Sequence, residues 1–252
     1  MPRALANLAP GLFTFVILGM LWEGAFRLGM TNPVLLPPPS IILPTLWQII
    51  VTGAVVKPLI DTLILLFSGF GIACVLGVAL GIGMGWNDRI YYLFDPLVEL
   101  IRPIPKAALV PPLFLFLGLG ATMKITTVAL AAFFPVLIST IQGVRGVDPV
   151  ATNTARTFGC PAPRMLWSVV LPASLPMIFT GMRVSLGLGL ILVILAEMLG
   201  GQGGLGYLIV DMQRSFAIRQ MYAWIFILAI LGLVLNAAFV FIESRAVPWR
   251  GK

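Results

Sequence analysis

Long apolar runs, separated by short polar or proline-rich stretches, dominate the chain. A helix that crosses a membrane needs about 20 mostly apolar residues. The runs that meet this requirement predict about six transmembrane spans, at residues 11–30, 59–86, 104–120, 124–143, 176–199 and 223–242. The pattern therefore predicts an all-α membrane protein that forms one transmembrane domain over residues 1–252.

The first and third predicted spans have features that decide how they are interpreted. In the first, Glu23 and Arg27 are four residues apart and can pair on one helix face. The segment lacks a small-residue cleavage site, which favours an uncleaved span over a signal peptide. A short interfacial helix capped by Ser40 is expected next. In the third span, prolines at 103 and 105 predict a short interfacial helix, a break, and then the span.

Composition and charge support a membrane location. Only 10% of the residues are charged and mean hydropathy is +1.05, against about 25% charged residues in soluble domains. The net charge of +7 fits the excess of Lys and Arg in cytoplasmic segments better than nucleic-acid binding. An even number of spans puts both termini on one side. The side with more basic residues, taken as the cytoplasm, holds Arg3, Arg89, Arg145, Arg156, Arg164, Arg245, Arg250 and Lys252. The other side holds Arg27, Lys57, Lys124, Arg214 and Arg219.

The chain lacks the residues that several kinds of catalysis and metal binding require. The chain has no histidine and two cysteines, Cys74 and Cys160, far apart in sequence. Histidine-based catalysis and zinc sites are excluded, and we expect no metal site and no cofactor. No G-x-x-x-x-G-K-[ST] sequence is present, so this chain does not bind ATP through a P-loop. We therefore expect a protein that is not an enzyme.

The polar loop at residues 144–172 is the longest on the predicted cytoplasmic side. Asp148 can cap a helix that has Pro149 in its first turn. A short helix is predicted from Val150 to Phe158, with Gly159 ending it in a left-handed conformation. A second helical stretch is predicted over 164–170. Such a helix can serve as a docking site for a soluble partner, and an ordinary solvated loop is the alternative.

The loop resembles the EAA loop of ABC-importer permeases. The spacing from Asn153-Thr154-Ala155 to Gly159, Val169 and Leu171-Pro172 matches the family pattern, with Asn153 and Thr154 standing where the family has Glu and Ala. A charged contact from position 153 is therefore lost, whereas the helix is retained. Other segments resemble the nitrate, sulfonate and taurine branch: 36–40, 102–105, 118–120, 172–176, 180–183, 196–197 and 204–207.

This resemblance implies a type I importer permease in a bacterial inner membrane. It implies a second copy of the chain, two cytoplasmic ATPase subunits that carry ATP and Mg²⁺, and a periplasmic or lipid-anchored solute-binding protein. The substrate would be a small anion such as a sulfonate, taurine or nitrate. An uncharged or heterocyclic nutrient is the alternative. The residues expected to couple to the ATPase are Asp148, Val150, Asn153, Thr154, Ala155, Arg156, Phe158, Gly159, Leu171 and Pro172.

Arg183 and Glu197 are ionisable residues within the fifth predicted span. They lie about 21 Å apart along a helix, too far to pair with each other. Each either pairs with another span or lines the translocation pathway, together with Ser185 and with Arg102 at its inner mouth. Arg102 has a second interpretation, because it can extend to the lipid headgroups. A stripe of small residues for close helix packing is formed by Gly181, Ser185 and Gly189.

Residues 201–206 match G-x-G-x-x-G. A dinucleotide site requires a strand before this motif, so a turn after the fifth span is expected instead. Two other classes compete with a permease. A secondary transporter usually has repeated halves and ionisable groups in several spans. A membrane enzyme needs converging polar groups. The sequence shows neither.

Overall fold

A computed structural model describes the backbone of residues 2–249 and the side chains of residues 13–249. Its helices are α1 (Pro2–Arg27), α2 (Pro39–Val51), α3 (Val56–Trp86), α4 (Asp88–Ile101), η1 (Lys106–Leu109), α5 (Val110–Leu117), α6 (Ala121–Arg145), α7 (Pro149–Thr157), α8 (Ala162–Met165), η2 (Leu166–Val170), α9 (Leu171–Gly200), α10 (Leu205–Arg214) and α11 (Ile218–Ala246). The side chain of Arg3, and Arg250 and Lys252, on which the predicted orientation partly rests, lie outside the described residues.

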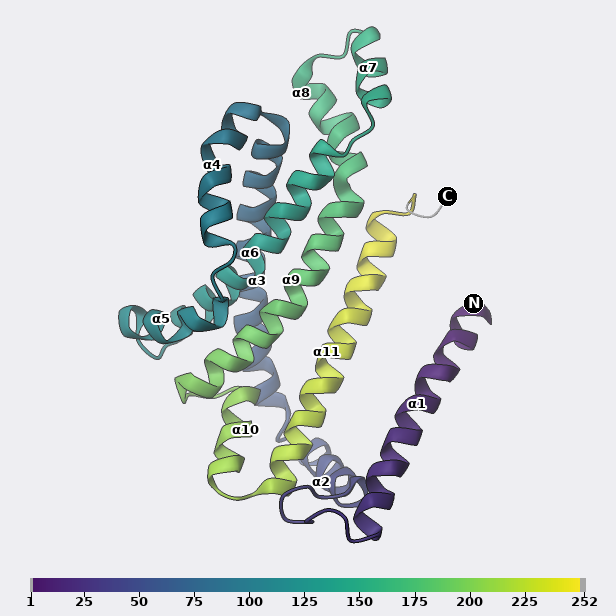
Figure 1. Ribbon diagram of the computed structural model, residues 1–252, viewed down its shortest axis with the longest axis vertical. Coiled ribbons are helices and arrows are strands. Elements are labelled where there is room, and N and C mark those ends of the chain that lie inside the picture. Colours follow the sequence, from purple (N-terminus) through teal and green to yellow (C-terminus); the bar gives the residue numbers. More distant parts are fainter. Residues whose placement is uncertain (1, 250–252) are drawn as a thin grey trace.

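The molecule is an elongated bundle with α7 at one end and α2 at the other (Figure 1). Helices α3, α6 and α9 run side by side through its middle, and α11 ascends beside them from the α2 end. Trp22 near the end of α1 stacks on Phe226 of α11, with 6.3 Å between ring centroids. Glu23 pairs with Arg27 at 3.2 Å, as predicted. Ser40 does not cap α2: Pro38 occupies that position, and the Ser40 amide donates to Glu23 Oε2 instead.

Four described helices are long and apolar enough to cross a membrane: 56–86, 121–145, the continuous helix 162–200, and 218–246. A fifth candidate is the bent pair Asp88–Ile101 and Lys106–Leu117. The first predicted span falls on α1, whose early side chains are not described. The count of six spans and the cytoplasmic termini therefore stay predictions.

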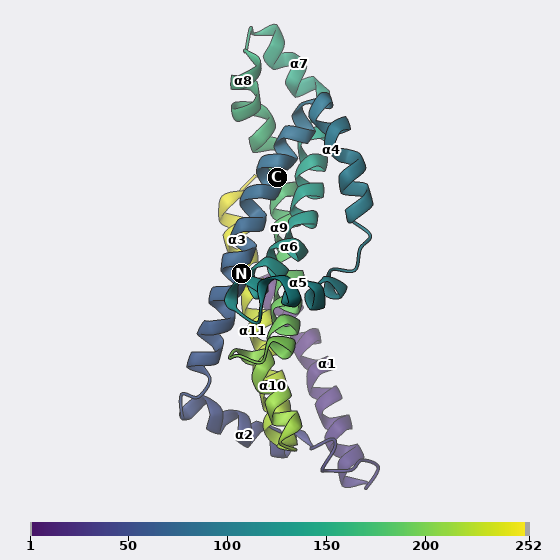
Figure 2. The same ribbon diagram turned by 90° about the vertical axis from the view of Figure 1, so that its left-hand side faces the viewer.

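The predicted span at 104–120 is not a single straight helix. The chain bends by 83° between α4 and the pair η1–α5, and Gly118, at φ +72°, ends α5. Pro103 and Pro105 lie in the bend, where their missing N–H groups prevent a continuous helix. The sequence predicted the break correctly, but α5 is much shorter than a span and lies across the bundle (Figures 1 and 2).

Glycines on one face of α3 allow α6 to approach very closely. A Cβ added at Gly81 would lie 2.6 Å from Thr140 Cβ and 3.0 Å from the Leu137 carbonyl oxygen. Gly69, Gly77 and Gly85 meet α6 in the same way. Because lipid tails are as apolar as leucine, such close contact is a main source of helix association in membranes. These four glycines therefore let α3 lie directly against the backbone of α6.

This packing gives a stability prediction. Gly81→Leu should destabilise the protein by about 1–3 kcal/mol, the usual range for overpacking. The matched control is Gly71→Leu on the same helix, because nothing lies within 4 Å of a Cβ at Gly71. Thermal denaturation of the purified protein in detergent measures both. Equal melting temperatures for the two variants would contradict the close-packing argument.

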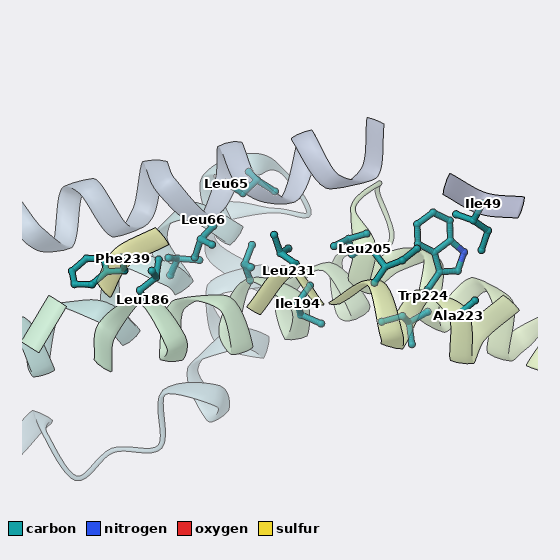
Figure 3. Packing of buried hydrophobic residues seen from close by; sticks show 14 of the residues in the cluster. Ile49, Leu65, Leu66, Leu186, Ile194, Leu205, Ala223, Trp224, Leu231 and Phe239 are labelled. Carbon is teal, nitrogen blue, oxygen red and sulfur yellow. The ribbon is translucent and has the colours of Figure 1, made fainter. Parts of the chain in front are cut away.

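The largest buried apolar cluster joins α2, α3, α6, α9, α10 and α11 (Figure 3). Leu66 of α3 and Leu186 of α9 lie at one end of it, and Leu205 and Trp224 lie at the other. The cluster fixes the short helix α10 against the long helices. It therefore sets the position of the glycine-rich turn that precedes α10.

Candidate functional site

Helix α7 is defined by local hydrogen bonds at both of its ends. Asp148 Oδ1 accepts from the Val150 amide at 2.8 Å, and Pro149 occupies the first turn, as predicted. At the other end Gly159 has φ +73°. The Gly159 and Cys160 amides donate to the Arg156 and Ala155 carbonyls at 2.9 and 3.0 Å. This is a Schellman ending, which requires a left-handed residue that glycine adopts without strain.

The outer face of α7 combines apolar and polar side chains. Val150 is 68% exposed and Phe158 is 85% exposed, and Asn153, Thr154 and Arg156 are exposed as well. The Thr154 hydroxyl donates to the Val150 carbonyl at 2.7 Å, so this hydroxyl is satisfied within the helix. We call these five residues the α7 surface. Aromatic residues and arginine are enriched at protein–protein interfaces, and this surface exposes one of each.

The second half of the loop is helical, as predicted, but it is continuous with the next span. The stretch predicted over 164–170 is not a separate helix but the beginning of one continuous helix over 162–200. Its segment Leu166–Val170 is a π-helix. Pro172 explains this, because proline has no N–H to donate to the Ser168 carbonyl four residues earlier. The backbone hydrogen bonds of the helix therefore shift locally to the wider π-helical spacing. Leu171 and Pro172 lie half-buried at the start of α9.

Arg145 connects the end of α6 to α4. Its Nη2 lies 2.7 Å from Asp88 Oδ1, and its guanidinium sits 3.8 Å from the centre of the Tyr91 ring. Asp88 and Tyr91 belong to the first turn of α4, and α7 starts only four residues after Arg145. Nothing in the sequence indicates this contact, which joins residues 57 positions apart.

Glu197 is fully buried and binds the first turn of α10. Its Oε1 accepts from the Thr62 hydroxyl at 2.8 Å, and its Oε2 accepts from the Gly206 amide at 2.9 Å. The Leu205 amide donates to Thr62 Oγ1 at 3.0 Å. A carboxylate at a helix N-terminus satisfies free amides and interacts favourably with the helix dipole. Contacts of this kind are expected if Glu197 holds helices together, which is the alternative to lining the translocation pathway.

The glycines of residues 201–206 form the turn between α9 and α10. Gly204 has φ +90°, and a Cβ there would overlap the Glu197 carboxyl group. Lys124 lies beside the turn, is 3% exposed, and donates from Nζ to the Gln202 carbonyl at 2.6 Å. Lys124 and Glu197 also interact electrostatically. The glycine pattern therefore builds a tight turn around a buried carboxylate.

Arg183 and the stripe of small residues lie on opposite faces of α9. Arg183 Nε donates to Asn236 Oδ1 of α11 at 3.0 Å. Ser185 Oγ donates to the Ala132 carbonyl of α6 at 2.7 Å. Cβ atoms at Gly181 and Gly189 would contact Ser139 of α6 and Leu66 of α3. The stripe thus packs against neighbouring spans of the same chain.

Arg102 lies at the C-terminal end of α4, at the bend described above. Its Nη1 is 3.4 Å from Glu99 Oε1, and both side chains are more than half exposed. It also lines a cavity between the bend, α6 and α9, together with Lys106 and Ser139. The volume of this cavity is about 360 Å³, and Arg183 borders a separate one of about 280 Å³ between α9 and α11.

Comparison with known proteins decides the family. Residues 73–248 match the family described as binding-protein-dependent transport system inner membrane component. The chain belongs to this family. It is the permease subunit of an ABC importer, as the resemblance of the loop predicted, and it is a multi-pass membrane protein.

Two curated relatives and one solved structure illustrate the match. The taurine transport system permease TauC of Escherichia coli is 31% identical over 95% of this chain and 89% of its own length. The formylaminopyrimidine transport permease ThiX of Halalkalibacterium halodurans is 31% identical over the full length of both chains. An inward-facing MetNI methionine ABC transporter superposes with a TM-score of 0.65 and 18% identity, covering 78% of this chain and 97% of that chain. This superposition supports the type I importer fold.

Sequence reasoning missed three polar residues of this permease. Thr62 and Lys124 complete the environment of Glu197, and Arg145 connects α6 to α4. A charged residue inside an apolar run is a signal that a partner exists. Lys124 carried that signal, but its position at the start of a predicted span placed it only among the basic residues of the outer side.

Proposed function

We propose that the α7 surface is the docking site for a cytoplasmic ATPase subunit and that this permease forms half of a translocation pathway. The observation that carries the proposal is the position of α7. It stands at the end of the bundle (Figure 1), and it is capped at both ends and leaves Phe158 exposed. Because the chain has no P-loop, energy must come from another subunit. Closure of the ATPase pair would move α7 and, through it, α6 and α9.

The proposed assembly contains a second copy of this chain, two ATPase subunits that bind ATP and Mg²⁺, and a periplasmic or lipid-anchored binding protein. In this assembly the permease binds no cofactor and catalyses no reaction itself. Its place is the inner membrane of a bacterium, with α7 and both termini in the cytoplasm. Helices α1 and α11 support this orientation, because the terminal end of each points toward the α7 end of the bundle (Figure 1).

We propose a small anion as the substrate, with a sulfonate such as taurine favoured. The similarity to TauC and the positive groups at the bend support this choice. An uncharged or heterocyclic nutrient is the second candidate, and the similarity to ThiX is the observation that favours it.

A reconstituted complex tests these proposals. The permease, its ATPase and its binding protein are placed in liposomes, and ATP-dependent uptake of labelled taurine, nitrate and a formylated aminopyrimidine is compared. A ligand screen of the binding protein runs in parallel, because that protein sets most of the specificity. Uptake of the pyrimidine alone would exclude the anion proposal, and uptake without ATP would exclude the ABC mechanism.

Arg183 gives a separate prediction. Because its guanidinium donates to Asn236, we propose that it holds α9 against α11. Arg183→Leu and Asn236→Leu should therefore lower the amount of folded permease to a similar extent, each by about 1–3 kcal/mol of stability. Uptake is normalised to the amount of permease in the membrane. A large loss of normalised uptake in Arg183→Leu alone would instead place Arg183 in the pathway.

A further inference from the structure

The cavity at the bend between α4 and η1 is formed by three separate parts of the chain. Arg102, Ile104 and Lys106 come from the bend, Phe134 and Ser139 from α6, and Leu188 from α9. Its volume of about 360 Å³ lies within the usual range of small-molecule sites, about 300–1,000 Å³. Most of the wall is apolar, with a few polar groups, which is also typical of such sites.

Lys106 is held in a fixed position at this cavity. Its ammonium donates to the Ile101 and Arg102 carbonyls at 2.7 and 3.4 Å and lies 4.2 Å from the centre of the Phe134 ring. An ammonium has three N–H donors, and these carbonyls take two of them. One N–H and the positive charge therefore remain available to an anion, and the side chain has little freedom left to lose on binding.

Acceptor and donor groups of α6 complete the polar part of the cavity. Pro135 has no N–H, so the Ala131 carbonyl lacks its normal helical donor, and both residues line the cavity. Ser139 stands against Gly181 of α9, where a Cβ would lie 2.5 Å from Ser139 Cβ. Gly181 thus allows Ser139 to occupy this wall. Residues that carry a cation, a hydroxyl and a carbonyl without its helical donor therefore line one volume.

We propose that this cavity is a transient binding site for a small organic anion during translocation, with Lys106 and Arg102 binding the acidic group. The proposal rests on the permease function proposed above and deepens it. The apolar walls formed by Ile104, Phe134 and Leu188 fit the carbon atoms of a sulfonate or carboxylate, whereas nitrate would fill only a small part of the volume. Arg183 is not part of this site, because it faces Asn236 on α11.

Ile104 provides a charge test that leaves the contacts of Lys106 in place. Its side chain is 39% exposed at the edge of the cavity, so a polar replacement loses little packing. Ile104→Asp and Ile104→Asn have nearly the same shape and differ by one negative charge. Ile104→Asp should transport labelled ethanesulfonate, a sulfonate with no amine, at least roughly tenfold more slowly than Ile104→Asn, since a desolvated like charge repels the anion.

The measurement is uptake into liposomes that contain the whole complex, at saturating loaded binding protein, normalised to reconstituted permease. Lys106→Gln should show a loss of similar size, and Lys106→Arg should recover much of it. Lys57→Gln, an exposed lysine that does not line the cavity, should behave like the unsubstituted protein. Equal uptake by Ile104→Asp and Ile104→Asn, or full uptake by Lys106→Gln, would overturn the site.

Two other outcomes separate this inference from the proposed function. If the unsubstituted complex takes up no anion under ATP, the anion transport function fails whatever the variants do. If it takes up nitrate but neither taurine nor ethanesulfonate, the transport class stands and the organic-anion site is wrong.

Discussion

Gly159→Pro should abolish most ATP-driven uptake while leaving the permease inserted in the membrane. Gly159 has φ +73°, and its amide donates to the Arg156 carbonyl at 2.9 Å. Proline fixes φ near −65° and has no N–H, so the Schellman ending cannot form and Phe158 loses its position. We expect uptake to fall by roughly tenfold or more, the effect of losing a contact worth about 1.4 kcal/mol or more.

The matched control is Gly53→Pro, near the other end of the bundle. Gly53 also has a positive φ, +71°, and its amide donates to the Ile50 carbonyl at 3.1 Å. Both variants suffer the same local strain, but only residue 159 adjoins the α7 surface. ATP hydrolysis, uptake and co-purification of the ATPase are measured for both. If Gly53→Pro uncouples hydrolysis from uptake as strongly as Gly159→Pro, α7 has no special role in coupling.

Glu197→Leu should be the most destabilising single substitution among the buried polar residues described above. It leaves the Gly206 amide and the Thr62 hydroxyl without their acceptor, and it removes one of the two acidic neighbours of the buried Lys124, the other being Asp61. Breaking a buried charged network typically costs about 3–5 kcal/mol. Thermal inactivation of the purified permease and its amount in the membrane measure the effect.

A double substitution separates charge from hydrogen bonding. Lys124→Met in the Glu197→Leu background should restore part of the lost stability, because it removes a buried cation that has lost its Glu197 neighbour. Glu197→Gln, which retains an acceptor of the same shape, should be less destabilising than Glu197→Leu. Strictly additive effects of the changes at positions 124 and 197 would show that the two side chains do not interact.

Local signals made α7 predictable from the sequence. Asp148 and Pro149 specify its start, and Gly159 with Pro161 specifies its end, so no distant residue is needed. The long apolar runs likewise predicted the centres of α3, α6, α9 and α11. The break at Pro103 and Pro105 was predictable for the same local reason, because proline lacks the helical donor.

Contacts between distant residues were not predictable. Glu197 is bound by Thr62, 135 positions away, and nothing in the sequence near Thr62 indicates this partner. The direction in which Arg183 points depends on the orientation of α9 about its own axis relative to α11. That orientation is set by the packing of the two helices. The orientation of α5 across the bundle also follows from packing, since the prolines fix where the chain bends but not where it goes.

The continuous helix over 162–200 has a mechanical consequence. At 1.5 Å per residue, its 39 residues extend about 58 Å, well beyond a hydrocarbon layer of about 30 Å. One end carries the loop of α7, and the other carries Glu197, which fixes the turn before α10. The helix can act as a lever that joins the two membrane faces. If α7 binds an ATPase, as proposed, a small tilt of this helix there would displace the turn before α10 through the helix itself.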